Sequence, residues 1–124
     1  MSYVGIVLIS HSEKVTSGLK EIIRQVIYDV PVEAAGGTDD GQIGTSIEKI
    51  KTAIQQVDQN RGVLVFYDLG SAKMNAELAI ELADLQQIQL VEAPLVEGAY
   101  VGAVEASIGK SMEEIMESIE QSFS

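Results

Sequence analysis

One histidine and one aspartate each directly follow an apolar run, and together they could carry nucleophilic chemistry. His11, the single histidine among 124 residues, lies between two serines after the run at residues 4–9. Asp68 directly follows the run at residues 63–67. A neutral imidazole is a good nucleophile near pH 7, and a neighbouring carboxylate can hold the proton on its other nitrogen. The pair predicts a histidine that takes up a phosphoryl group and passes it on.

A phosphoryl group on His11 needs hydrogen-bond donors, and backbone amides are a better source than the eight basic residues. Ser12 and Ser71 stand where helices would begin after strands, and free amides at such helix starts bind anions. A Gly-Gly-Thr stretch could add amides and one hydroxyl, because glycine lets the backbone approach an anion closely. The predicted phosphate-binding residues are Ser12, Gly36, Gly37, Thr38, Gly70 and Ser71.

Each of these residues also has an ordinary alternative role. A lone histidine is more often structural, and only the position of His11 after a central strand favours chemistry. Asp68 could simply be an acid at a helix start, and residues 36–38 could be a flexible turn. Asp39 and Asp40 are read as a solvated loop rather than metal ligands, because the chain has no cysteine and one histidine. No metal site and no directly bound cofactor are predicted.

Four segments that alternate with helical patterns must position these residues. Residues 4–9 and 63–67 are continuously apolar, as strands buried on both faces are. Residues 30–35 and 89–93 are mixed in polarity, as edge strands are, and Pro31 also favours an edge. Strand alternating with helix predicts a doubly wound α/β domain with a mainly parallel four-stranded sheet, order 2-1-3-4, and helices on both faces. Both chemical loops then open into the crevice between the first and third strands.

The helical patterns show apolar residues at spacings of three and four. Thr45 with Glu48 and Ser111 with Glu114 have the spacing of capping boxes. Two further helices are expected after the fourth strand. The apolar residues of the five patterns are Val15, Leu19, Ile22, Ile23, Val26 and Ile27; Ile43, Ile47, Ile50, Ile54 and Val57; Met74, Leu78, Leu82 and Leu85; Val101, Val104 and Ile108; and Met112, Ile115, Met116, Ile119 and Phe123.

Composition limits the expected partners and cellular compartment of the protein. The net charge of −11 disfavours nucleic acid and anionic membranes as partners and favours a protein with a basic face. The absence of cysteine fits a reducing compartment. The start of the chain lacks the features of a secretory signal, and no segment is long and apolar enough to span a bilayer. We expect one cytoplasmic domain over residues 1–124.

Four stretches resemble the phosphocarrier subunit of bacterial phosphoenolpyruvate-dependent dihydroxyacetone kinase, which is related to the mannose-type IIA domains of the sugar phosphotransferase system. They are GIVLISHS at 5–12, GGTDDGQIGTS at 36–46, VFYDLGSAKMNAE at 65–77 and APLVEGAYVGAVEASIG at 93–109. The resemblance implies that His11 is the phosphorylated histidine and that Asp68 and residues 36–38 belong to the active site. It also implies a homodimer.

The same resemblance implies a phosphotransferase reaction in glycerol and dihydroxyacetone metabolism. The donor would be the phosphohistidine of the carrier protein HPr, and the acceptor would be ADP held on the nucleotide-binding subunit of the kinase. Because the sequence ends at Ser124, without fused carrier domains, we expect separate donors. Mannose-type domains have an additional antiparallel strand near the C-terminus, whereas the residues after Ala93 are predicted here to be helical.

Other functions remain open at this point. The chain could be the IIA component of a mannose-type sugar transporter, with the same chemistry and another acceptor. A receiver-like binding module without phosphohistidine would need an acidic pair after the first strand, where Ser10 and His11 stand instead. A hydrolase would ordinarily need arginines or metal ions around the histidine.

Overall fold

Two buried strands form the centre of a four-stranded parallel sheet. They are β1 (Gly5–Ile9) and β3 (Val63–Tyr67). Nearly all of their side chains are buried, on both faces of the sheet. The edge strands are β2 (Val32–Ala34) and β4 (Ile88–Val91), which gives the order β2-β1-β3-β4. The computed structural model describes residues 1–123. The predicted α/β class and strand order are confirmed.

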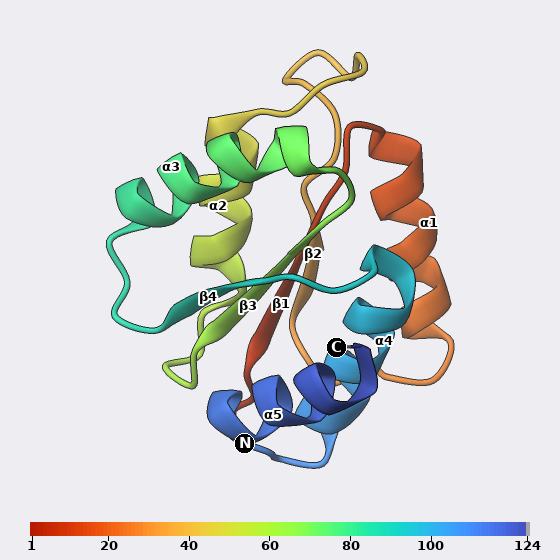
Figure 1. The fold of residues 1–124 in the computed structure, drawn as a ribbon, viewed down its shortest axis with the longest axis vertical. Coiled ribbons are helices and arrows are strands. Elements are labelled where there is room, and N and C mark those ends of the chain that lie inside the picture. The colour runs from red at the N-terminus through yellow and green to blue at the C-terminus, as the bar shows by residue number, and fades with distance from the viewer. Residues whose placement is uncertain (124) are drawn as a thin grey trace.

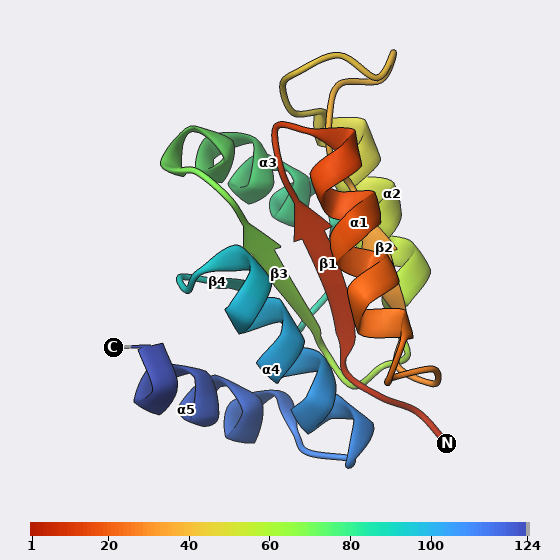
Figure 2. The same ribbon diagram turned by 90° about the vertical axis from the view of Figure 1, so that its right-hand side faces the viewer.

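Alternation along the central strands divides the core into two layers. Ile6 and Leu8 pack on one side of the sheet, and Val7 and Ile9 pack on the other, because successive side chains of a strand point to opposite faces. Figures 1 and 2 show helices covering both sides of the sheet. The helices on the Ile6 side are α1 (Glu13–Arg24), α4 (Leu95–Ser107) and α5 (Met112–Phe123), and those on the Val7 side are α2 (Ile47–Val57) and α3 (Lys73–Ala83).

Helix starts follow the predicted capping chemistry at two of the predicted sites. The Ser12 hydroxyl accepts from the Val15 amide at the start of α1. Ser111 and Glu114 each accept from the other's amide, which is the capping box predicted for α5. The predicted cap at Thr45 is wrong by one residue. Ser46 is the N-cap of α2 and accepts from the Lys49 amide, so the Thr45 hydroxyl is free for another contact.

Several segment boundaries also differ from the predictions. β2 begins only at Val32, because Pro31 has no amide to donate, although its carbonyl accepts from the Ile6 amide at 2.9 Å. Ile43 lies outside α2, in the loop at residues 36–46, and is 77% exposed. Ser71 lies inside a short 3₁₀ turn, η1 (Gly70–Ala72), that precedes α3.

The residues after Ala93 form α4 and α5, as predicted. Within residues 1–123 the sheet therefore has four strands, all parallel, and no antiparallel strand follows β4. No helix in this part of the chain is long and apolar enough to cross a membrane. The loop at residues 36–46 extends past the carboxyl edge of the sheet, at the top of Figure 1.

Candidate functional site

The carboxyl ends of the two central strands place His11 beside Asp68. Ile9 and Tyr67 are paired in the register of β1 and β3, so the residues that follow them leave the sheet together. The Nδ1 atom of His11 lies 3.1 Å from Oδ1 of Asp68, and the His11 amide donates to Oδ2 at 3.0 Å. The ring is 25% exposed, so it is reachable from solvent while its orientation is fixed. The structure thus brings together the two predicted catalytic residues.

The Asp68 carboxylate is held by four donors. Besides the amide and the ring of His11, it accepts from the Leu69 amide at 2.7 Å and from the Ser10 hydroxyl at 2.9 Å. Burial raises the pKa of Asp68, but the hydrogen bonds from His11, Ser10 and Leu69 outweigh burial and hold this pKa below the ordinary 3.8. Asp68 is therefore ionised at neutral pH and can only accept.

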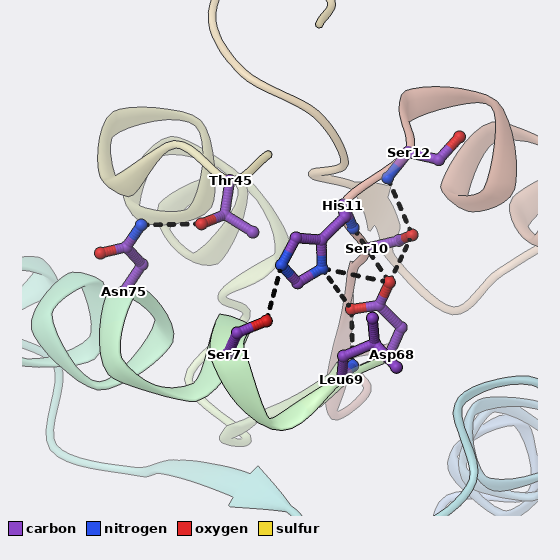
Figure 3. Close-up of polar contacts among 8 residues, drawn as sticks. All are labelled: Ser10, His11, Ser12, Thr45, Asp68, Leu69, Ser71 and Asn75. Atoms are coloured by element: carbon purple, nitrogen blue, oxygen red, sulfur yellow. Dashed lines mark hydrogen bonds and ion pairs between the residues drawn. The ribbon is translucent and has the colours of Figure 1, made fainter. Parts of the chain in front are cut away.

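An ionised Asp68 fixes the tautomer of the neutral His11 ring. The carboxylate has no proton to give, so we assign the ring proton to Nδ1, which donates to Asp68. Nε2 then carries the lone pair, and the Ser71 hydroxyl donates to it at 3.0 Å. Figure 3 shows the ring between Asp68 on one side and Ser71 on the other. The arrangement presents Nε2 as the nucleophile and Asp68 as the group that stabilises a cationic ring.

Ser10 is a residue of this site that the sequence analysis did not assign. Its side chain is buried, with 1% of the residue exposed. Its hydroxyl donates to Asp68 and accepts from the Ser12 amide at 3.0 Å, which links the carboxylate to the start of α1. The available signal was its place in the tripeptide Ser10-His11-Ser12, since a hydroxyl beside a strand end can reach the neighbouring strand's loop.

The turn η1 brings the Ser71 hydroxyl to Nε2 and, in the described part of the chain, contains unpaired amides. In residues 1–123 the amides of Gly70 and Ser71 donate to no protein acceptor, as expected for the first residues of a helical turn. An added Cβ at Gly70 would meet nothing within 4 Å, so this backbone is open to a ligand. Ser12 lies at the start of α1 but its amide is bound to Ser10, and its hydroxyl caps the helix.

The predicted Gly36–Thr38 turn lies against the same loop, with its polar groups bonded inside the protein. The Gly37 amide donates to the Ser10 carbonyl at 3.0 Å, and the Thr38 amide donates to the Gln42 carbonyl at 3.0 Å. A Cβ at Gly36 would come within 2.5 Å of the Ser12 carbonyl, so glycine is required there for close packing. These contacts give the turn a positioning role, and phosphate binding by it stays a prediction.

Most charged side chains near the site already form hydrogen bonds or ion pairs within the protein. Lys49 donates to the carbonyls of Gly36 and Thr38, and Lys73 is paired with Glu92. Asp40 accepts from the Thr38 hydroxyl, and Asp39 accepts from the Ser46 hydroxyl. In the described residues no three histidine, aspartate or glutamate side chains gather as a metal site would require.

Comparison with protein families places most of the chain in a known group. A family model described as the fructose IIA component of the phosphotransferase system matches residues 5–116. That match includes His11, Ser71 and Asp68.

Two curated relatives and one solved structure are similar over nearly the whole chain. The phosphotransferase subunit DhaM of the phosphotransferase-system-dependent dihydroxyacetone kinase of Lactococcus lactis is 40% identical, covering 98% of this chain and 96% of its own length. The phosphoryl donor subunit DhaM of Listeria innocua dihydroxyacetone kinase 1 is 43% identical, covering 90% and 88%. The crystal structure of EF1359, described as of unknown function, has a TM-score of 0.84 and 36% identity, covering 97% and 94%.

Proposed function

The chain belongs to the fructose IIA component family of the phosphotransferase system and, within it, to the phosphotransferase subunits of dihydroxyacetone kinase, and from this we propose that it carries a phosphoryl group on His11. It takes the group from the phosphohistidine of HPr and gives it to ADP on the nucleotide-binding subunit of the kinase. The protein itself binds no cofactor and works in the cytoplasm.

The observation that carries this proposal is the orientation of the His11 ring. Asp68 occupies Nδ1, so the lone pair of Nε2 is left on the side of the ring where the Ser71 hydroxyl lies. A partner's phosphoryl group that approaches Nε2 in line displaces the Ser71 hydroxyl from the lone pair. Among the predicted phosphate-binding residues, Gly70 and Ser71 are best placed to donate to it, because their turn carries the Ser71 hydroxyl to Nε2 and their amides have no protein acceptor within residues 1–123.

The proposed transfer conserves atoms and charge at each step. The Nε2 lone pair forms a bond to phosphorus as the donor's nitrogen–phosphorus bond breaks, and that bond's electrons stay on the donor's imidazole. His11 keeps its proton on Nδ1, and the ionised Asp68 stabilises the positive charge of the phosphorylated ring. In the second step a β-phosphate oxygen of ADP takes the phosphoryl group, and the electrons return to Nε2.

Intact mass spectrometry tests the site and the donor. After incubation with phosphoenolpyruvate, enzyme I and HPr, the protein should gain one acid-labile phosphoryl group. Omission of HPr should abolish the gain, and the His11→Ala variant should show none. A phosphoryl group that persists in His11→Ala would refute the assignment of the site. A base-labile group would indicate an acyl phosphate instead.

A second acceptor deserves a direct comparison, because the matching family model describes a IIA component of a sugar transport system. In that case the chemistry at His11 is unchanged and a IIB domain receives the phosphoryl group. Purified phosphorylated protein should be mixed either with the ADP-loaded kinase subunit or with a IIB domain. Formation of ATP in the first mixture supports our proposal, and transfer only in the second would contradict it.

We further propose that the protein is a homodimer. Met74, Leu78 and Leu82 are 71%, 43% and 58% exposed and lie one turn apart on α3, which leaves an apolar stripe on the surface. A second copy of the chain that covers this stripe would remove it from water. Light scattering during gel filtration should give twice the 13.3 kDa mass of one chain. A mass of one chain at micromolar concentration would overturn this proposal.

A further inference from the structure

A hydrogen bond beside His11 joins two residues to which neither the fold nor the proposed transfer assigns a role. The side-chain amide of Asn75 in α3 donates to the Thr45 hydroxyl in the loop at residues 36–46, at 2.7 Å. Because Ser46 is the N-cap of α2, the Thr45 hydroxyl does not cap the helix. The two side chains are therefore free of a capping role and could bind a ligand.

Both residues are held on the Nε2 side of the ring. Asn75 lies in the first turn of α3, which directly follows the η1 turn that carries Ser71. Thr45 follows Gly44, whose amide donates to the His11 carbonyl at 2.9 Å. Figure 3 shows the Thr45–Asn75 pair on the same side of the ring as Ser71, with Asp68 opposite.

A phosphoryl group on Nε2 would carry about two negative charges on three oxygens and would need several donors. The Lys49 ammonium group already donates to the carbonyls of Gly36 and Thr38. The Lys73 ammonium group is already paired with Glu92. Uncharged donors on the Nε2 side are thus the nearest source. Besides Ser71, Asn75 and Thr45 have side chains on that side that can donate.

We propose that Thr45 and Asn75 bind the phosphoryl group of phosphorylated His11. This inference rests on the proposed function. On phosphorylation the neutral bond between the two side chains is exchanged for two bonds to phosphoryl oxygens, which are stronger because the acceptor is charged. The Asn75 amide turns from Thr45 to the phosphoryl group, and the Thr45 hydroxyl changes from acceptor to donor. In the unphosphorylated protein the pair keeps both groups satisfied.

Nuclear magnetic resonance of the side-chain amide of Asn75 tests the exchange directly. Phosphoramidate, a small phosphoryl donor, removes any dependence on a partner protein. On phosphorylation of the wild-type protein the Asn75 side-chain amide signal, identified by its loss in Asn75→Ala, should shift, and it should stay unshifted in His11→Ala. If His11 becomes phosphorylated and this signal does not move, the inference is overturned. If His11 is not phosphorylated by any donor, the proposed function fails, and this inference with it.

Substitutions give an independent measurement. Thr45→Val keeps the shape and removes the hydroxyl, and it should slow phosphorylation by phosphoramidate about tenfold, as loss of one bond to a charged group predicts. Thr45→Ser keeps the hydroxyl and should restore the rate. Thr52→Val makes the same chemical change at an exposed position of α2 and should leave the rate unchanged. A rate for Thr45→Val within twofold of the wild type would contradict the proposal, provided that Thr45→Ser is also folded and active.

Discussion

The proton on His11 is placed by a carboxylate that cannot donate. Asp68 accepts from the ring, from two backbone amides and from the buried hydroxyl of Ser10. Each of these donors is fixed by a strand end or by the start of α1. The tautomer of His11 is therefore determined by the backbone around Asp68 as much as by the side chain itself.

Replacement of Asp68 by asparagine tests this control. Asparagine has one acceptor oxygen for four donors, so its amide would face donors and could reverse the ring tautomer. We expect phosphorylation of His11 to slow about 100-fold. Nitrogen chemical shifts of the ring should show loss of the proton from Nδ1. Asp29→Asn, an exposed change beyond the opposite edge of the sheet, is the matched control, and an unchanged tautomer in Asp68→Asn would contradict the assignment.

The lowered pKa of Asp68 also predicts how stability depends on pH. A carboxyl whose pKa is lower in the folded protein stabilises the fold above its unfolded pKa, near 3.8, and loses this contribution as pH falls through the folded value. Urea unfolding between about pH 7 and about pH 3 should therefore show a difference between wild type and Asp68→Asn that shrinks at the acid end. A difference that stays constant with pH would show that the charge of Asp68 does not contribute.

At the scale of elements, the start of α1 is held by close contact with Gly36. A Cβ at Gly36 would lie 2.4 Å from the Thr16 hydroxyl and 2.5 Å from the Ser12 carbonyl. Both atoms belong to the segment that directly follows His11. The loop at residues 36–46 therefore positions the nucleophile through contacts rather than through charge.

Gly36→Ala should destabilise the protein by about 2 kcal/mol, because the backbone carbonyl of Ser12 must move. Gly18→Ala is the matched control. Gly18 lies within α1 with nothing within 4 Å of an added Cβ, so alanine there should stabilise the protein by about 0.5–1 kcal/mol. Urea unfolding of both variants measures the two effects, and equal stabilities would contradict the packing role of Gly36.

The element boundaries show where sequence patterns lose precision. The apolar periodicity that located α2 extended back to Ile43, but Ile43 is exposed in the loop, four residues before α2 begins at Ile47. The predicted cap at Thr45 was also one residue early, because Ser46 supplies the capping oxygen. Either residue could have capped the helix by type. The choice depends on contacts with distant residues, since the Thr45 hydroxyl binds Asn75, thirty positions away.

At the scale of the whole molecule, the net charge of −11 predicts the salt dependence of partner association. If HPr presents a basic face, raising sodium chloride from about 0.05 M to about 0.5 M should lower the bimolecular rate of phosphotransfer, because screening weakens the attraction. Phosphoramidate is an anion, so its rate should stay constant or rise with salt. A phosphotransfer rate from HPr that rises with salt would contradict electrostatic attraction.

We also expect the chain to unfold as one domain. Both core layers are built on β1 and β3, so disruption of these strands in one layer exposes the apolar side chains of the other layer to water. Urea unfolding followed by circular dichroism and by tyrosine fluorescence should give coincident transitions. Separate midpoints for the two signals would indicate two independent units.

Sequence patterns alone predicted the fold class, the strand order and the meeting of His11 with Asp68, because buried strands have continuous apolar runs and parallel strands end at one edge. They also identified Ser12 and Ser111 as helix caps, since these interactions are local. Three features emerged only from the packing of the elements: the ring nitrogen that carries no proton, the bond from Ser10 to Asp68, and the bond from Asn75 to Thr45. Those contacts join residues up to 58 positions apart, and their geometry depends on how whole elements pack against one another.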